Sequence, residues 1–181
     1  MKIFFTLGIL MSGFVSTAQE LFAYSEPASN MPAKSIGIRL SNGFMRMQHT
    51  STYNHQLIPE LMLGLSKNLM FHAEGFLDNR AGNFKANGAG LYAKYRFLSK
   101  DEVHSHFRMA AFTRFSYNRA AIYQPAIELN GMNSGYEAGI VATQLIQKTA
   151  ISAGASFLHA TDNGNGNKFS VEDSKRNAIG C

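Results

Sequence analysis

The sequence predicts an all-β protein whose strands follow one another in an antiparallel up-and-down sheet. Seven segments alternate apolar and polar residues with a period of two, which is the period of a strand with one buried face. The connections between these segments alternate strictly between short and long ones. The composition agrees, because a chain of 181 residues with 14 Phe, 7 Tyr and 16 Gly favours strands and turns. The length suits a single domain.

The N-terminal region predicts an exported protein. Lys2, an apolar run over residues 3–15 and a small-residue exit at Ala18 have the order of a secretory signal peptide. The run is shorter than the roughly 20 residues that a spanning helix needs, so we expect cleavage after Ala18. The predicted domains are a signal peptide over residues 1–18, an extended N-terminal lead-in over residues 19–34 and a β-barrel domain over residues 35–181.

The alternating segments begin after the lead-in and continue almost to the end of the chain. They cover residues 35–40, 57–65, 69–77, 89–97, 106–118, 136–146 and 151–157. Residues 177–181 look like the beginning of an eighth strand, so we expect about eight strands or more. Asn42 and Gly43 form a hairpin signal between apolar residues. A hairpin there would leave arms of about six residues, short of the roughly 9–11 of a tilted membrane strand, so we expect a bulge within one long first strand.

The connections sort into two kinds by length. The short ones cover residues 66–68, 98–105 and 147–148, and the long ones, rich in Asn, Gly and Asp, cover residues 47–56, 78–88, 119–135 and 159–177. This order is typical of an up-and-down barrel with tight turns at one end and loops at the other.

The strand period also separates an apolar face from a polar face. The polar face carries all the charged residues of the clear strands, and the predicted network combines them with His72: Arg39, Glu60, His72, Glu74, Lys94, Arg96, Arg108, Arg114 and Glu137. Alternation alone fits a soluble sheet as well as a membrane barrel. However, Tyr92 and Phe112 share the polar face, and aromatic residues such as Tyr95 and Tyr117 end the apolar one, as they do at membrane interfaces. We therefore predict a lumen-facing charged network and a lipid-facing apolar surface.

On these strands, and on the turns at Lys67-Asn68 and Lys100-Asp101, the chain resembles the outer-membrane β-barrel proteins of Gram-negative bacteria, in the porin-like or OmpA-like group. The resemblance covers residues 35–181. It implies an antiparallel up-and-down transmembrane β-barrel in the cell outer membrane, contact with outer-membrane lipid, and insertion by the barrel-assembly machinery. Such barrels have an even number of strands and usually end in an aromatic residue, whereas this chain ends in Gly180-Cys181. We therefore expect the chain to be truncated at its C-terminus.

The predicted function is non-enzymatic: a passive channel for small solutes, or a structural scaffold that presents external loops. The alternatives are a soluble periplasmic lipocalin-like ligand carrier, and an outer-membrane hydrolase or acyltransferase that uses His72 and Glu74 as an acid/base pair. We expect no cofactor and no metal, because the His and Met residues have no fixed ligand spacing and Cys181 is the single cysteine. We also expect no nucleic-acid partner, because the 17 Lys and Arg residues are scattered singly.

Overall fold

A computed structural model describes the chain over residues 26–46, 53–80, 82–103, 105–120, 127–146, 149–162 and 167–177. The predicted signal peptide, residues 19–25 of the predicted lead-in and Cys181 lie outside these residues.

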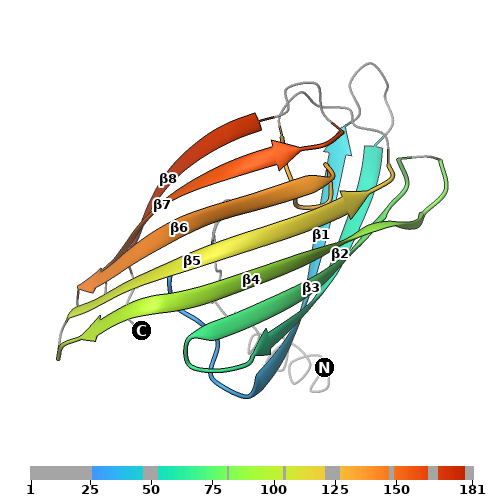
Figure 1. Ribbon diagram of the computed structural model, residues 1–181. Helices are drawn as coiled ribbons and strands as arrows, with labels where there is room; N and C mark the ends of the chain where they lie inside the picture. The colour runs from blue at the N-terminus through green and yellow to red at the C-terminus, as the bar shows by residue number, and fades with distance from the viewer. Residues whose placement is uncertain are drawn as a thin grey trace, which may run out of the picture.

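The described residues form one antiparallel sheet of eight strands. In chain order these are β1 (Ser35–Arg46), β2 (Tyr53–Gly64), β3 (Leu69–Asp78), β4 (Lys85–Asp101), β5 (Ser105–Asn118), β6 (Gly135–Ile146), β7 (Thr149–Ala160) and β8 (Asn167–Asn177). Each strand pairs with the next one along the chain, from β1 to β8 (Figure 1). The predicted all-β, up-and-down arrangement is confirmed.

The position of the eighth strand differs from the prediction. Residues 159–177 were expected to form a long external loop, but β8 occupies Asn167–Asn177 and pairs with β7 from Thr149 to His159. We expected a strand to begin at residue 177, and this prediction is wrong because Asn177 is the last residue of β8. Residues 178–181 lie outside the described part of the chain.

The first strand is a single strand, as predicted, but it contains no bulge. The pairing of β1 with β2 runs without a shift from Ser35 opposite Gly64 to Arg46 opposite Tyr53. Gly43 has no positive φ, so neither a type I′ turn nor a glycine bulge forms there. The register shifts instead at Phe76/Leu77 between β3 and β4, and in β4 between Arg96 and Leu98.

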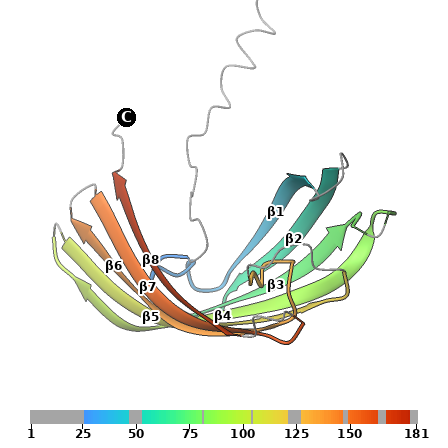
Figure 2. The same ribbon diagram turned by 90° about the horizontal axis from the view of Figure 1, so that it is seen from above.

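The sheet curls into a trough that does not close. Figure 2 shows its two arms, with β1 and β2 on one side and β6 to β8 on the other. β1 and β8 are the two ends of the strand order, and the described residues show no pairing between them. The closed barrel that we expected is therefore not formed. The sheet curves too little over its eight strands to bring the edge strands β1 and β8 together.

The two faces of the trough differ in burial. The convex face exposes large apolar side chains such as Ile38 (81% exposed), Phe44 (67%) and Leu91 (47%). The concave face buries Phe76, Lys94 and other side chains of mixed polarity. Within the described part of the chain, no helix has the length and apolar character needed to cross a bilayer.

Two stretches outside the strands lie inside the trough. The first, residues 26–34, is called the lead-in segment here, and its Ala28 is fully buried in a cluster with Met70, Tyr92 and Phe112. The second, residues 127–134, is called the loop segment, and its Ile127 and Leu129 pack in a cluster with Leu158 and Ala160. Each segment covers a different part of the concave face (Figure 2).

Candidate functional site

The concave face carries an ion pair between the edge strand β1 and its neighbour β2. The register places Arg39 of β1 opposite Glu60 of β2. The Nε and Nη2 atoms of Arg39 both lie 2.7 Å from Glu60 Oε2. Glu60 is buried, so its negative charge needs this partner.

The other oxygen of Glu60 faces a histidine on the next strand. Glu60 lies directly opposite Glu74, and Met62 opposite His72, so His72 is the diagonal neighbour of Glu60 on the same face. His72 Nδ1 lies 2.5 Å from Glu60 Oε1. The predicted acid/base pair joined His72 to Glu74, but the strand pairing gives His72 a different carboxylate.

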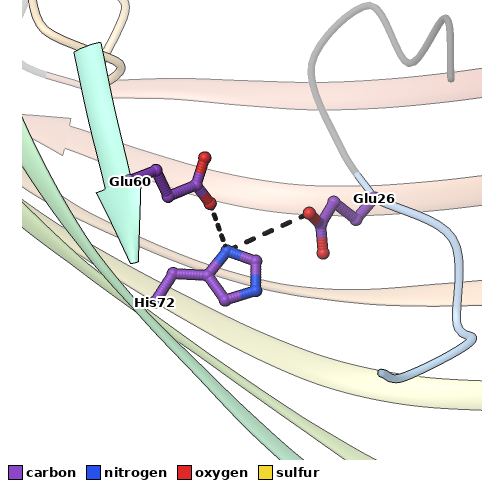
Figure 3. A group of neighbouring side chains, drawn as sticks. All are labelled: Glu26, Glu60 and His72. Carbon is purple, nitrogen blue, oxygen red and sulfur yellow. Dashed lines mark ion pairs between the residues drawn. The ribbon is translucent and has the colours of Figure 1, made fainter. Parts of the chain in front are cut away.

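A second acidic group reaches this pair from outside the sheet. Glu26 of the lead-in segment places Oε1 4.0 Å from His72 Nδ1 and 3.7 Å from Arg39 Nη2. In Figure 3, both carboxylates point toward the same ring nitrogen of His72, that of Glu60 from β2 and that of Glu26 from the segment at the right. Glu26 was not among the predicted network residues.

Lys94 fastens this part of the lead-in segment to the sheet. Its side chain is only 1% exposed, and Nζ lies 3.1 Å from Glu26 Oε2 and donates to the carbonyl oxygen of Pro27 at 2.8 Å. The amide of Ala28 donates to Thr143 Oγ1 at 3.0 Å, on β6. The segment therefore spans the trough from β1 and β2 to β6.

The other residues of the predicted network fall into separate places. Arg114 and Glu137 are opposite each other on β5 and β6, with 3.6 Å between Nη1 and Oε2, and the Arg114 guanidinium lies 5.3 Å from the Tyr92 ring centre. Glu74 is buried next to Gly90, where a Cβ atom would stand 3.0 Å from its Oε2. The concave face thus carries a second ion pair beside the first.

Arg96 and Arg108 lie toward the turns instead of the centre. Arg96 donates to the carbonyl oxygen of Lys67 at 2.7 Å. Arg108 pairs with Asp101 at 3.2 Å and donates to Ser29 of the lead-in segment at 3.3 Å. The predicted set therefore divides into a group around Glu60, the Arg114–Glu137 pair of β5 and β6, and two arginines that contact turns and the lead-in segment.

Glu26, Glu60 and His72 offer three metal-ligand atoms that lie within 4.8 Å of one another. Two features disfavour a metal ion there. The 2.5 Å separation of Glu60 Oε1 and His72 Nδ1 is shorter than the roughly 3 Å between two ligands that each stand about 2.0–2.2 Å from zinc. The second oxygen of each carboxylate already contacts a cation, Arg39 or Lys94. The geometry suits a network of ion pairs better than a metal centre.

A second polar cluster lies under the loop segment. The carbonyl oxygen of Gly131 accepts from Gln56 Nε2 at 3.0 Å, from Arg80 Nη2 at 2.8 Å and from Asn118 Nδ2 at 2.6 Å. Arg80 also forms a buried ion pair with Asp78 at 2.8 Å. Asp78 and Arg80 were absent from the predicted network because they stand at the boundary between strand and loop, where the period of two ends.

Comparison of the chain with models of protein families, with characterised proteins and with solved structures finds no match.

Proposed function

We propose that this protein is a non-enzymatic outer-membrane protein of the β-barrel type, in which the sheet meets lipid with its convex face and serves as a scaffold for the loops between its strands. The observation that carries the proposal is the reversal of the two faces: large apolar side chains are exposed, while ionised side chains are buried. A soluble sheet has the opposite arrangement.

The extent of the exposed apolar surface supports a lipid environment over a soluble ligand carrier. The apolar series continues from strand to strand, with Ile36 and Leu40 on β1, Leu61 on β2, Leu91 on β4 and Ile140 on β6 all exposed. Soluble monomers rarely expose contiguous apolar patches of more than a few hundred Å².

The spacing of aromatic residues along one strand supports the same environment. Phe107 and Tyr117 share the apolar face of β5 and are ten positions apart. At about 3.3 Å per residue they are separated by roughly 33 Å along the strand. A tilt of about 40° reduces this to roughly 25 Å along the bilayer normal, which is the height of the apolar band of outer-membrane barrels.

The contents of the trough favour a scaffold over a channel. The lead-in segment crosses the concave face, the loop segment covers another part of it, and Tyr92, Phe112 and Met70 pack between the charged groups. Barrels of about eight strands have interiors that side chains fill. We expect no steady ion conductance when the purified protein is added to a planar bilayer; well-resolved open levels would favour the channel.

The enzyme alternative has less support. An acyl-transfer site needs a nucleophile within hydrogen-bonding reach of its base. Among the described residues, His72 Nε2 is buried and has no hydrogen-bond partner, while its Nδ1 faces carboxylates. His72 therefore resembles a member of an ion-pair network.

The free edges set a condition for the proposal. A bilayer offers no water to the unpaired backbone groups of β1 and β8, so in lipid these edges must pair with each other or with strands from elsewhere. The edges pair in the membrane-embedded form that we propose.

The contact of each face with lipid can be tested by introducing a single tryptophan, because the chain contains none. Phe115 on β5 is 56% exposed and Phe112 on the same strand is buried, so Phe115→Trp and Phe112→Trp are matched probes. In vesicles with brominated acyl chains, we expect strong fluorescence quenching of the Phe115→Trp protein and weak quenching of the Phe112→Trp protein. Equal quenching, or emission typical of water from both, would contradict a lipid-facing convex surface.

A further inference from the structure

We propose that Lys94, Arg39 and His72 form a carboxylate-binding site on the concave face, which the Glu26 side chain occupies from within the same chain. The ligand class is a small carboxylate, such as acetate or the carboxylate of an acidic side chain. This inference goes beyond the scaffold function, and it does not depend on where the protein resides.

The basic groups of the site are built into the sheet. Lys94 and His72 belong to β4 and β3 and are 1% and 2% exposed, and Arg39 on β1 completes the arrangement. A buried ammonium group is costly unless a counter-charge stands beside it. Glu60 already contacts Arg39 through one oxygen and His72 through the other. Glu26 places a carboxylate beside the Lys94 ammonium, with 3.1 Å between Oε2 and Nζ.

The acidic group, in contrast, is not part of the sheet. Glu26 belongs to the lead-in segment, and its side chain is 21% exposed, so the site opens to solvent on the side from which this carboxylate enters. Of its distances to the three basic groups, only the 3.1 Å contact with Lys94 is in hydrogen-bond range; those to Arg39 and His72 are 3.7 and 4.0 Å. A free carboxylate, which has no chain attached, can reach the same three groups.

The groups around Glu26 favour an anion over a cation. The Glu26 carboxylate lies among Lys94, Arg39 and His72, so the position vacated by its side chain is lined by three basic groups. A carboxylate placed there meets the same three groups, and the vacated position provides the space for it.

The test is chemical rescue of a Glu26→Ala variant of the full chain folded in detergent micelles. We expect its Tm to fall by several degrees relative to the unsubstituted protein in sodium chloride. Sodium acetate at the same ionic strength should restore at least half of that loss, and should leave the Tm of the unsubstituted protein unchanged. Glu102→Ala is the matched control, because Glu102 is an exposed carboxylate beyond the end of β4, and acetate should not affect it.

A second substitution links the rescue to the site. In the Glu26→Ala/Lys94→Met protein, the Tm in sodium acetate should be no higher than the Tm in sodium chloride. The proposal is overturned if acetate and chloride act alike on Glu26→Ala, or if acetate stabilises the double variant equally well. Stabilisation of the unsubstituted protein by Zn²⁺, lost in Glu26→Ala, would overturn it in favour of a cation site. If Glu26→Ala does not fold in chloride, the folded fraction recovered in acetate and in chloride is compared instead, with the same two outcomes.

Discussion

The two segments inside the trough are held in different ways. The loop segment is fixed mainly by hydrogen bonds that involve its backbone, such as those of the Gly131 carbonyl oxygen and the bond from Ser116 Oγ to the carbonyl oxygen of Asn133 at 2.9 Å. The lead-in segment is fixed at Glu26 by ion pairs with side chains of three strands, and by the hydrogen bonds of Pro27 and Ala28.

This difference has a consequence for dynamics. Buried backbone hydrogen bonds keep their full strength as long as the strands are paired, so the loop segment should open only when the sheet unfolds. A partly exposed carboxylate can be exchanged for water or for another anion, so the lead-in segment should open while the sheet remains folded.

Asp78→Ala should have the largest effect, because it leaves the Arg80 guanidinium without its buried counter-charge. Both side chains are at most 2% exposed, and loss of one partner of a buried pair costs about 3–5 kcal/mol. The free energy of unfolding, measured by urea titration in micelles, should fall by about that amount. Asp101→Ala, which breaks the exposed pair with Arg108, is the control and should cause a much smaller change. Similar losses from both variants would show that the cluster under the loop segment has no special importance.

Gly131→Ala should cause the next largest loss in the free energy of unfolding. Gly131 has φ +84°, and an added Cβ would stand 2.3 Å from Gln56 Nε2, so both strain and a clash oppose the substitution. We expect a loss of about 1–3 kcal/mol in the same titration. Gly43→Ala is the matched control: Gly43 lies in β1, and an added Cβ would meet nothing within 4 Å. A loss at residue 43 equal to that at residue 131 would contradict the close fit of the loop segment.

The strands could be predicted where one face is apolar and the other polar. Segments such as 69–77 and 106–118 show this alternation clearly, and they correspond to β3 and β5. β8 was missed because charged residues occupy both phases of its period, with Glu172 next to Asp173 and Lys175 next to Arg176. A pattern of two faces cannot be seen where neither face is apolar.

The candidate site could be predicted only in part, and for a related reason. Alternation places Glu60, His72 and Lys94 on one face, but it says nothing about which strand neighbours meet. The contact of His72 with Glu60 depends on the register between β2 and β3, and that of Lys94 with Glu26 joins residues 68 positions apart. Glu26 lies in a segment without a period, so its place in the trough could not be inferred from spacing.

Thr143→Val should loosen the lead-in segment and not the loop segment, although it also removes the hydrogen bond between Thr143 and Ser152 Oγ on β7. The substitution removes the acceptor of the Ala28 amide, and an unmade buried hydrogen bond costs about 1–2 kcal/mol. Amide hydrogen exchange of residues 26–31 should become about 5–30-fold faster, while that of residues 127–134 should not change. Thr113→Val is the matched control, because its hydroxyl donates to the carbonyl oxygen of Glu137 and does not bond to the lead-in segment. Faster exchange in both segments would indicate that the sheet, and not the lead-in segment, had opened.

The smallest expected effect is that of salt. At about 1 M sodium chloride the screening length is roughly 3 Å, comparable with the distances between Glu26 and its basic partners. Because the Glu26 side chain is 21% exposed, salt should reach this carboxylate and raise the exchange rate of residues 26–31 by a few-fold. The loop segment should respond less, because Ser116 and Asn118 hold it through neutral hydrogen bonds and the Asp78–Arg80 pair beneath it is shielded from water. The exposed Asp162 carboxylate, which accepts from the Ser134 amide at 2.7 Å, is the contact of this segment that salt can reach. An equal response of both segments to salt would contradict the distinction between an exchangeable ionic anchor and a fixed hydrogen-bonded one.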